Sequence, residues 1–120
     1  MIIINLEELA KKIKWNKKHA DKAIIHNSIL VIIENTNKAK TKDIKQLEKT
    51  IETILKGPLK NHLPLTNNPS KIIAIIHARK TDPMIPRILR AKTKKNITYH
   101  TASCNQHLNT ILAKHGIIKK

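Results

Sequence analysis

The fold of this chain is decided by one stretch, Ala20-Asp21-Lys22-Ala23-Ile24-Ile25-His26-Asn27-Ser28-Ile29-Leu30-Val31-Ile32-Ile33-Glu34-Asn35-Thr36. Two apolar runs, at about residues 22–26 and 29–34, flank a His-Asn-Ser turn, and the Ile and Val that dominate them are typical of buried strands. The stretch therefore predicts a β-hairpin. One acid precedes the first run and another ends the second. Pairing of the two arms is expected to bring Asp21 and Glu34 together at the open end of the hairpin.

The charge balance points to a polyanionic partner. The 120 residues, the length of a single domain (1–120), carry 24 Lys and Arg against 8 acids, a formal net charge of +16. A compact domain with such a field attracts nucleic acid most often and an anionic membrane less often. The other explanation is a Lys-rich surface that serves solubility, or a composition biased towards Asn, Ile and Lys.

The rest of the composition excludes several classes of protein. With two glycines and neither GxGxxG nor GxxxxGK[ST], the chain lacks the signatures of a dinucleotide fold and of a P-loop. Its single cysteine, Cys104, excludes an intrachain disulfide framework and a cysteine-based zinc cluster. The apolar run at residues 2–4 is too short for a signal peptide or a transmembrane helix. A cytoplasmic protein without a membrane partner is expected.

Periodicity outlines the remaining elements. Apolar residues at spacings of three and four predict helices at about residues 5–15, 42–56 and 105–115, with one more beginning at or after the Asp-Pro at residues 82–83. Strands are expected at 71–78 and 96–102, and a polar, basic loop at 37–42. Strands separated by helices imply an α/β fold with a mixed sheet of about four strands, flanked by helices on both faces.

Two carboxylates at one end of a hairpin are the minimum set for a hard divalent cation. Mg²⁺ and Mn²⁺ prefer oxygen ligands and complete their coordination with water and substrate phosphate. Such an ion polarises a phosphodiester and lowers the pKa of a bound water. The alternative is that Asp21 and Glu34 each cap a strand and pair with one of the many lysines.

The order of these features resembles a known family. An Ala-Asp followed by apolar residues, a short turn, an apolar run ending in Glu34, a basic loop and a helix carrying Gln46 are similar to the PD-(D/E)xK nuclease superfamily over about residues 5–100. The resemblance implies a restriction-endonuclease-like core and an endo- or exonuclease that uses Mg²⁺ or Mn²⁺. It implies Asp21 and Glu34 as catalytic metal ligands, favours DNA over RNA as substrate, and makes a homodimer an expectation.

The chain departs from the family motif at one residue. Thr36 stands where the family has a lysine that positions the attacking water, so Lys38, or Lys40 beside it, is expected to supply that charge from the loop. Gln46, Thr36 and Glu8 are expected to support the site. In some branches a Tyr follows the Gln by four residues, and here Thr50 stands in its place. A relative that has lost cleavage and kept binding to nucleic acid or to a larger complex is the alternative reading.

Further basic residues are candidates for contacts with phosphates, which would bind a strand without reading its sequence. They are Lys40, Arg79, Lys80, Arg87, Arg90 and Lys94. For any one of them a solvated helix face is the other explanation. A third reading is an RNA-binding module, because residues 72–116 distantly resemble the L7Ae/L30e binders. The Gly-rich RNA-contacting turn of that fold has no counterpart in this chain.

Overall fold

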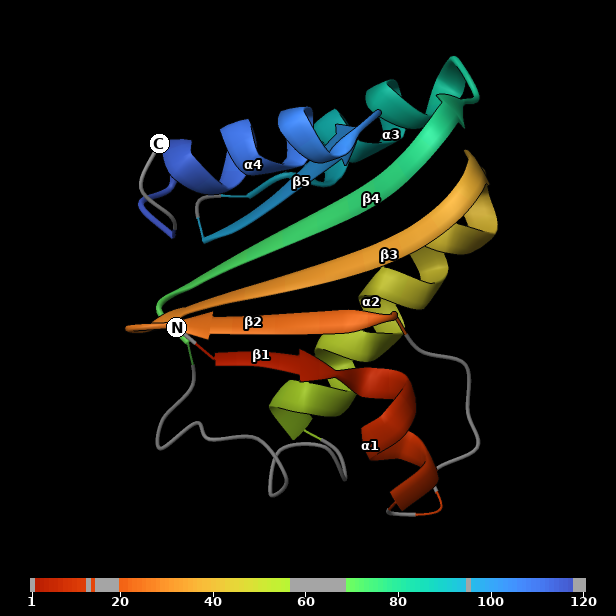
Figure 1. The fold of residues 1–120 in the computed structure, drawn as a ribbon. Coiled ribbons are helices and arrows are strands. Elements are labelled where there is room, and N and C mark those ends of the chain that lie inside the picture. Colours follow the sequence, from red (N-terminus) through yellow and green to blue (C-terminus); the bar gives the residue numbers. More distant parts are fainter. Residues whose placement is uncertain (1, 13, 15–19, 57–68, 95, 118–120) are drawn as a thin grey trace.

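In a computed structural model, the chain is described over residues 2–12, 14, 20–56, 69–94 and 96–117. Five strands form one sheet in the order β1-β2-β3-β4-β5, with helices on both sides of it (Figure 1). The strands are β1 (Ile2–Asn5), β2 (Lys22–His26), β3 (Ile29–Ala39), β4 (Lys71–Thr81) and β5 (Ile97–Ala102). The helices are α1 (Leu6–Lys12), α2 (Thr41–Lys56), α3 (Met84–Lys92) and α4 (Asn105–Lys114).

The sheet is mixed, as expected. β1, β2 and β3 pair antiparallel, whereas β4 runs parallel to both β3 and β5. The α/β class is therefore confirmed, but the sheet has five strands instead of about four. The additional strand is β1, whose residues pair with β2 at one edge of the sheet (Figure 1).

The hairpin forms where the sequence predicts it. β2 and β3 are joined at Asn27-Ser28, and Asn27 adopts a φ of 55°. Asn tolerates this left-handed region better than most residues do, which suits it to a two-residue turn. The turn fixes the register of the two arms, and the register in turn decides which residues of β2 and β3 face each other.

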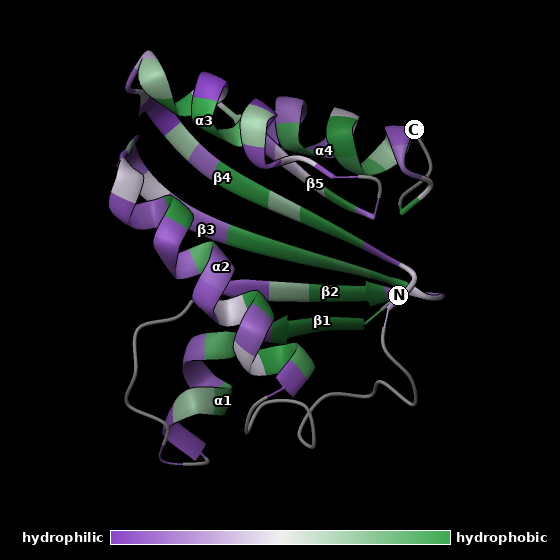
Figure 2. Cartoon of the chain, turned by 180° about the vertical axis from the view of Figure 1, so that it is seen from behind, coloured by the Kyte–Doolittle hydropathy of each residue, from purple (hydrophilic) through white to green (hydrophobic). Residues whose placement is uncertain are grey.

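Each face of the sheet buries its own apolar cluster. Alternate residues of β3, beginning with Leu30 and Ile32, pack with α1, α2 and α3, whereas Val31 and Ile33 pack with α4 on the other face. Such alternation follows from the two-residue period of a strand. Coverage on both faces explains the continuous apolar runs of β3 and β4. In Figure 2 these runs give way to hydrophilic residues towards the ends of the two strands.

Several predicted boundaries were wrong. The segment 37–42 is not a loop, because β3 continues to Ala39 and pairs Lys38 with Lys80 of β4. The first helix begins at Leu6, not at residue 5, because Asn5 belongs to β1; α1 is described as Leu6–Lys12, and the predicted end at about residue 15 lies outside the described residues. Asn5 nevertheless caps it, since its side chain accepts a hydrogen bond from the N–H of Glu8 at 3.1 Å.

The helix after the Asp-Pro pair begins late, as expected. α3 starts at Met84, and the carbonyl of Asp82 accepts the N–H of Ile85 at 2.9 Å. Among the described helices, none combines the length and the apolarity that crossing a bilayer requires.

Candidate active site

The hairpin register brings the two predicted carboxylates together. The last printed pair of the β2–β3 ladder joins Lys22 to Ile33, and the N–H of Asp21 still donates to the carbonyl of Ile33 at 3.0 Å. One position further along, Asp21 lies opposite Glu34. Their side chains are hydrogen-bonded to each other, so they are close enough for one cation to contact both.

Glu34 is buried to an unusual degree for an acid. Its side chain lies in the layer between β3 and α2, and the residue is only 4% exposed. Burial above all, and then the hydrogen bond with Asp21 and the negative charge of Asp21, raise the pKa of Glu34 from 4.5 to about 9. At neutral pH Glu34 therefore keeps its proton, and its protonated carboxyl group donates a hydrogen bond to Asp21. Its Oε2 atom finds no hydrogen-bond partner among the described residues.

Hydrogen bonds made by Asp21 and by the residue before it hold Asp21 in place. Its Oδ2 accepts the N–H of Asn35 at 2.7 Å, and its carbonyl accepts the N–H of Leu6 at 2.9 Å. Directly before it, the N–H of Ala20 donates to the hydroxyl of Thr50 at 2.8 Å in the core. These contacts tie Asp21 to β3, α1 and α2, and they preorganise its carboxylate.

Thr50 has a role that the sequence did not predict. The family pattern drew attention to it only because it stands where some members have a tyrosine. The residue is fully buried, and its hydroxyl donates to the carbonyl of Gln46 at 2.8 Å while accepting from Ala20. It therefore fixes the backbone immediately before Asp21. No local feature of the sequence indicates a contact across 30 residues.

The N-terminus of α2 adds two further charges to the site. Asp43 is 3% exposed, and its Oδ2 accepts the N–H of Lys40 at 2.8 Å, which caps the helix. The negative charge of Asp43 raises the pKa of Glu34, and the positive charge of Lys42 lowers it. Lys42 is thus the lysine whose field acts on Glu34, a residue that sequence reasoning passed over.

The predicted supporting residues lie at different distances from this centre. Thr36 is half-buried two residues after Glu34, and the nearest acceptor of its hydroxyl is the carbonyl of Lys38, at 3.5 Å. Lys38 and Lys40 are exposed, and neither is among the charges that shift the pKa of Glu34. Gln46 is half-buried on α2. Glu8 is exposed in the first turn of α1.

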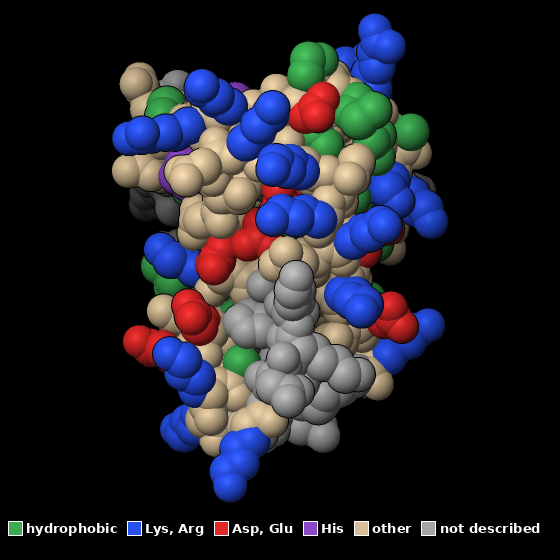
Figure 3. Space-filling view, turned by 90° about the vertical axis from the view of Figure 1, so that its right-hand side faces the viewer, with side chains coloured by type: hydrophobic (Ala, Val, Ile, Leu, Met, Phe, Trp, Pro, Cys, Tyr) green, Lys and Arg blue, Asp and Glu red, His purple; other side chains and the backbone are tan. Residues whose placement is uncertain are grey.

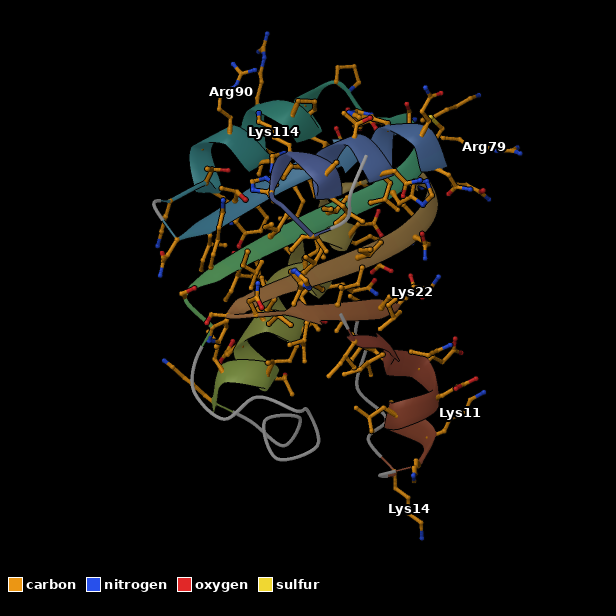
Figure 4. The ribbon with its side chains drawn as sticks, turned by 60° about the vertical axis from the view of Figure 1, so that its left-hand side comes forward. Lys11, Lys14, Lys22, Arg79, Arg90 and Lys114 are labelled. Atoms are coloured by element: carbon orange, nitrogen blue, oxygen red, sulfur yellow. The ribbon has the colours of Figure 1, made fainter. Side chains whose placement is uncertain are left out.

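The surface at this end of the sheet carries many basic side chains. Figure 3 faces the end of the sheet where β3 and β4 finish, and it shows acidic side chains near the middle with Lys and Arg side chains directly beside them. Arg79 and Lys80 are exposed at the end of β4. The other predicted phosphate contacts, Arg87, Arg90 and Lys94, are exposed on or just after α3. In Figure 4, Arg79 and Arg90 point away from each other, so one short strand would not contact both.

The few metal ligands that the protein offers at this site suit a cation that completes its coordination with water and phosphate. In the described part of the chain no group of three or more His, Cys, Asp and Glu side chains is arranged to hold a metal. Two carboxylates, one of them with an unpartnered buried oxygen, match Mg²⁺ or Mn²⁺, which keep several waters and bind through one or two carboxylates plus phosphate. They do not match a structural zinc site, which needs four ligands from the protein.

Comparison with known proteins identifies no relative. No protein-family model matches the chain, and neither curated proteins nor solved structures include a significant match.

Proposed function

We propose that this protein is a nuclease-like enzyme of the PD-(D/E)xK type, in which Asp21 and Glu34 bind Mg²⁺ or Mn²⁺ and act on a phosphodiester of nucleic acid. One observation carries the proposal: the buried carboxyl of Glu34 lies against that of Asp21 with Oε2 unpartnered. An orphaned buried oxygen is costly to stability, and such costs are typical of functional sites. A divalent cation bound there would replace the proton of Glu34 and neutralise the negative charge of the two carboxylates.

The surroundings fit a phosphodiester substrate. The net charge of +16 attracts the polyanion, and Lys and Arg side chains are exposed at the end of the sheet where β3 and β4 finish. Lys42, on the first turn of α2, acts electrostatically on Glu34 and is the first candidate for the charge that the family places at Thr36. Lys38 remains a second candidate on β3. The expected substrate is DNA in preference to RNA, and the expected compartment is the cytoplasm.

A catalytically silent protein that binds nucleic acid is the second candidate. The observation that favours it is Thr36, because a hydroxyl that faces its own strand cannot neutralise charge at a scissile phosphate. In that case the carboxyl pair would remain as an inherited feature and the basic surface would still bind a strand. The two candidates differ in cleavage and agree in binding.

The test is cleavage of labelled DNA and RNA, single-stranded and duplex, with Mg²⁺, with Mn²⁺ and with EDTA. The variants are Asp21→Asn and Glu34→Gln, which keep size and hydrogen bonding but remove the negative charge. Glu52→Gln on the exposed face of α2 is the control. We expect cleavage by the wild type and by the control, with Mn²⁺ or Mg²⁺ only, and loss of at least about a hundredfold in either site variant. Wild-type binding without cleavage would support the silent candidate instead.

A further inference from the structure

On the other face of the sheet, at the same end, the surface is hollowed. The hollow has a volume of about 400 Å³ and lies where β3 and β4 finish and α4 begins. The carboxyl ends of parallel strands are where open α/β sheets bind their ligands. Neither the carboxyl pair nor any motif of the sequence accounts for this hollow. Its lining residues are Asn35, Thr36, His77, Ala78, Arg79, Ser103, Cys104 and Asn105.

The lining chemistry selects for an anion. It contains the exposed guanidinium of Arg79, the imidazole of His77 and several hydroxyl and amide groups, and it contains no acid. Arginine presents a planar fork of donors that matches a phosphate. The first turn of α4 contributes to the same wall, and its field also favours negative charge.

His77 is held in an orientation that leaves one ring nitrogen for a ligand. Its Nδ1 lies 3.0 Å from the side-chain oxygen of Asn35, which can only accept, so Nδ1 carries the proton. Its Nε2 has no hydrogen-bond partner among the described residues. Because His77 lines the hollow, its Nε2 can form a hydrogen bond with a group that binds there.

Asn35 connects the hollow to the carboxyl pair. Its backbone N–H donates to Asp21 at 2.7 Å, while its side chain bonds His77 across the β3–β4 ladder. A single residue of β3 therefore contacts a proposed metal ligand and a wall of the hollow.

We propose that this hollow binds a non-scissile backbone phosphate of the nucleic-acid strand, with Arg79 and His77 as the contacting side chains. The proposal rests on the proposed function for its choice of ligand, but its contacts do not include the metal ligands. The hollow should accordingly bind the strand in the absence of divalent cations.

The only cysteine of the chain provides a direct readout. Cys104 lies in the lining and is exposed, so its alkylation by iodoacetamide reports whether the hollow is occupied. The experiment measures the alkylation rate by mass spectrometry in EDTA, with no addition, with inorganic phosphate, or with an oligonucleotide at the same phosphate concentration. We expect the oligonucleotide to slow alkylation at least about fivefold and inorganic phosphate to have little effect, because many strand contacts act together.

Arg79→Gln is the test variant, and Lys11→Gln is its matched control. Both substitutions remove one positive charge from an exposed side chain, and Figure 4 shows Lys11 on α1, far from Arg79. We expect Arg79→Gln to weaken oligonucleotide binding about tenfold, to lose the protection of Cys104 and to lower the salt slope by about one. Lys11→Gln should keep the protection and the slope.

The outcomes separate this proposal from the nuclease proposal. Metal-dependent cleavage without protection of Cys104 would overturn the phosphate site and leave the nuclease standing. Protection that depends on Arg79, without cleavage, would support the phosphate site and remove the nuclease. Equal protection by inorganic phosphate would overturn the assignment to a strand, and so would equal effects of the two substitutions or a complete lack of binding.

Discussion

The carboxyl group of Glu34 is hydrogen-bonded to that of Asp21, and the two, Glu34 buried and Asp21 half-buried, lie within a protein of net charge +16. Two acids in this arrangement cannot both be ionised at low energy, so one proton stays between them. A divalent cation would replace that proton and relieve the repulsion. The pair therefore links folding stability to pH, and the proposed metal binding should depend on the same proton.

The stability of the protein should fall as the pH rises. The pKa of Glu34 is raised from 4.5 to about 9 in the folded state, so between these values the folded state binds one more proton than the unfolded state. The contribution of Glu34 to the free energy of unfolding is fully present below about pH 4.5 and is lost as the pH rises towards 9. At ~1.4 kcal/mol per pH unit the loss amounts to several kcal/mol.

Glu34→Gln should remove this pH dependence. Denaturant unfolding at pH 6, 7.5 and 9 is expected to show a steep decline for the wild type and a nearly flat profile for the variant, which cannot ionise. Glu52→Gln, at an exposed position of α2, should decline as the wild type does. Parallel profiles for Glu34→Gln and the wild type would show that Glu34 does not retain its proton in the folded protein.

The hydroxyl of Thr50 should matter for stability and for the position of Asp21. Thr50→Val keeps the shape of the side chain but removes the hydroxyl that accepts the N–H of Ala20 at 2.8 Å. We expect a loss of about 1–3 kcal/mol in the free energy of unfolding, the usual result when a buried donor loses its partner.

Thr53→Val is a matched control for that change. The hydroxyl of Thr53 bonds the carbonyl four residues earlier, as that of Thr50 does, but the bond is exposed and makes no tertiary contact. Its effect should stay within about 0.5 kcal/mol. Similar losses in both variants would mean that the bond to Ala20 contributes nothing of its own.

Lys42 should influence the site more than Lys38 does. Its charge lowers the pKa of Glu34, so Lys42→Gln should raise that pKa further. If Lys42 also neutralises charge at the phosphate, cleavage should fall by about ten- to a hundredfold. Lys38→Gln is the comparison, and a larger effect there would return the catalytic lysine to β3.

Binding to nucleic acid should depend steeply on salt. A strand that contacts several lysines and arginines releases counterions, so log K should fall linearly with log salt concentration, with a slope of about −0.7 per contacted phosphate on a single strand. Fluorescence anisotropy between about 50 and 200 mM salt measures this slope. A flat profile would contradict a backbone-tracking surface.

Local sequence was sufficient for the hairpin and the position of the acids. The apolar runs on either side of Asn27-Ser28 and the flanking Asp21 and Glu34 are local features, and the two-residue period of strands fixes which residues meet. The same reasoning missed β1, because a four-residue strand next to a helix is defined by its pairing with β2. It also ended β3 too early, since the polar residues 35–38 are held by parallel pairing with β4.

The surroundings of the acids could not be predicted in the same way. Thr50 reaches Ala20 across 30 residues, and Lys42 approaches Glu34 only because α2 begins beside the end of β3. The hollow at Arg79 combines residues of β3, β4 and the start of α4. Such contacts depend on how the layers pack, and periodicity in one segment carries no information about them.

We expect Asp21 and Glu34 to hold a divalent cation together, and calorimetry of Mn²⁺ binding measures this without relying on cleavage. One site is expected in the wild type, with an affinity that rises up to about tenfold per pH unit below pH 9 as the cation displaces the proton of Glu34. One proton should be released per ion, measurable by comparing two buffers. Asp21→Asn and Glu34→Gln should each abolish this site, and Glu52→Gln should keep it. Mn²⁺ binding of equal strength in the wild type and Glu34→Gln, or no binding to the wild type, would show that these two carboxyl groups do not form a metal site.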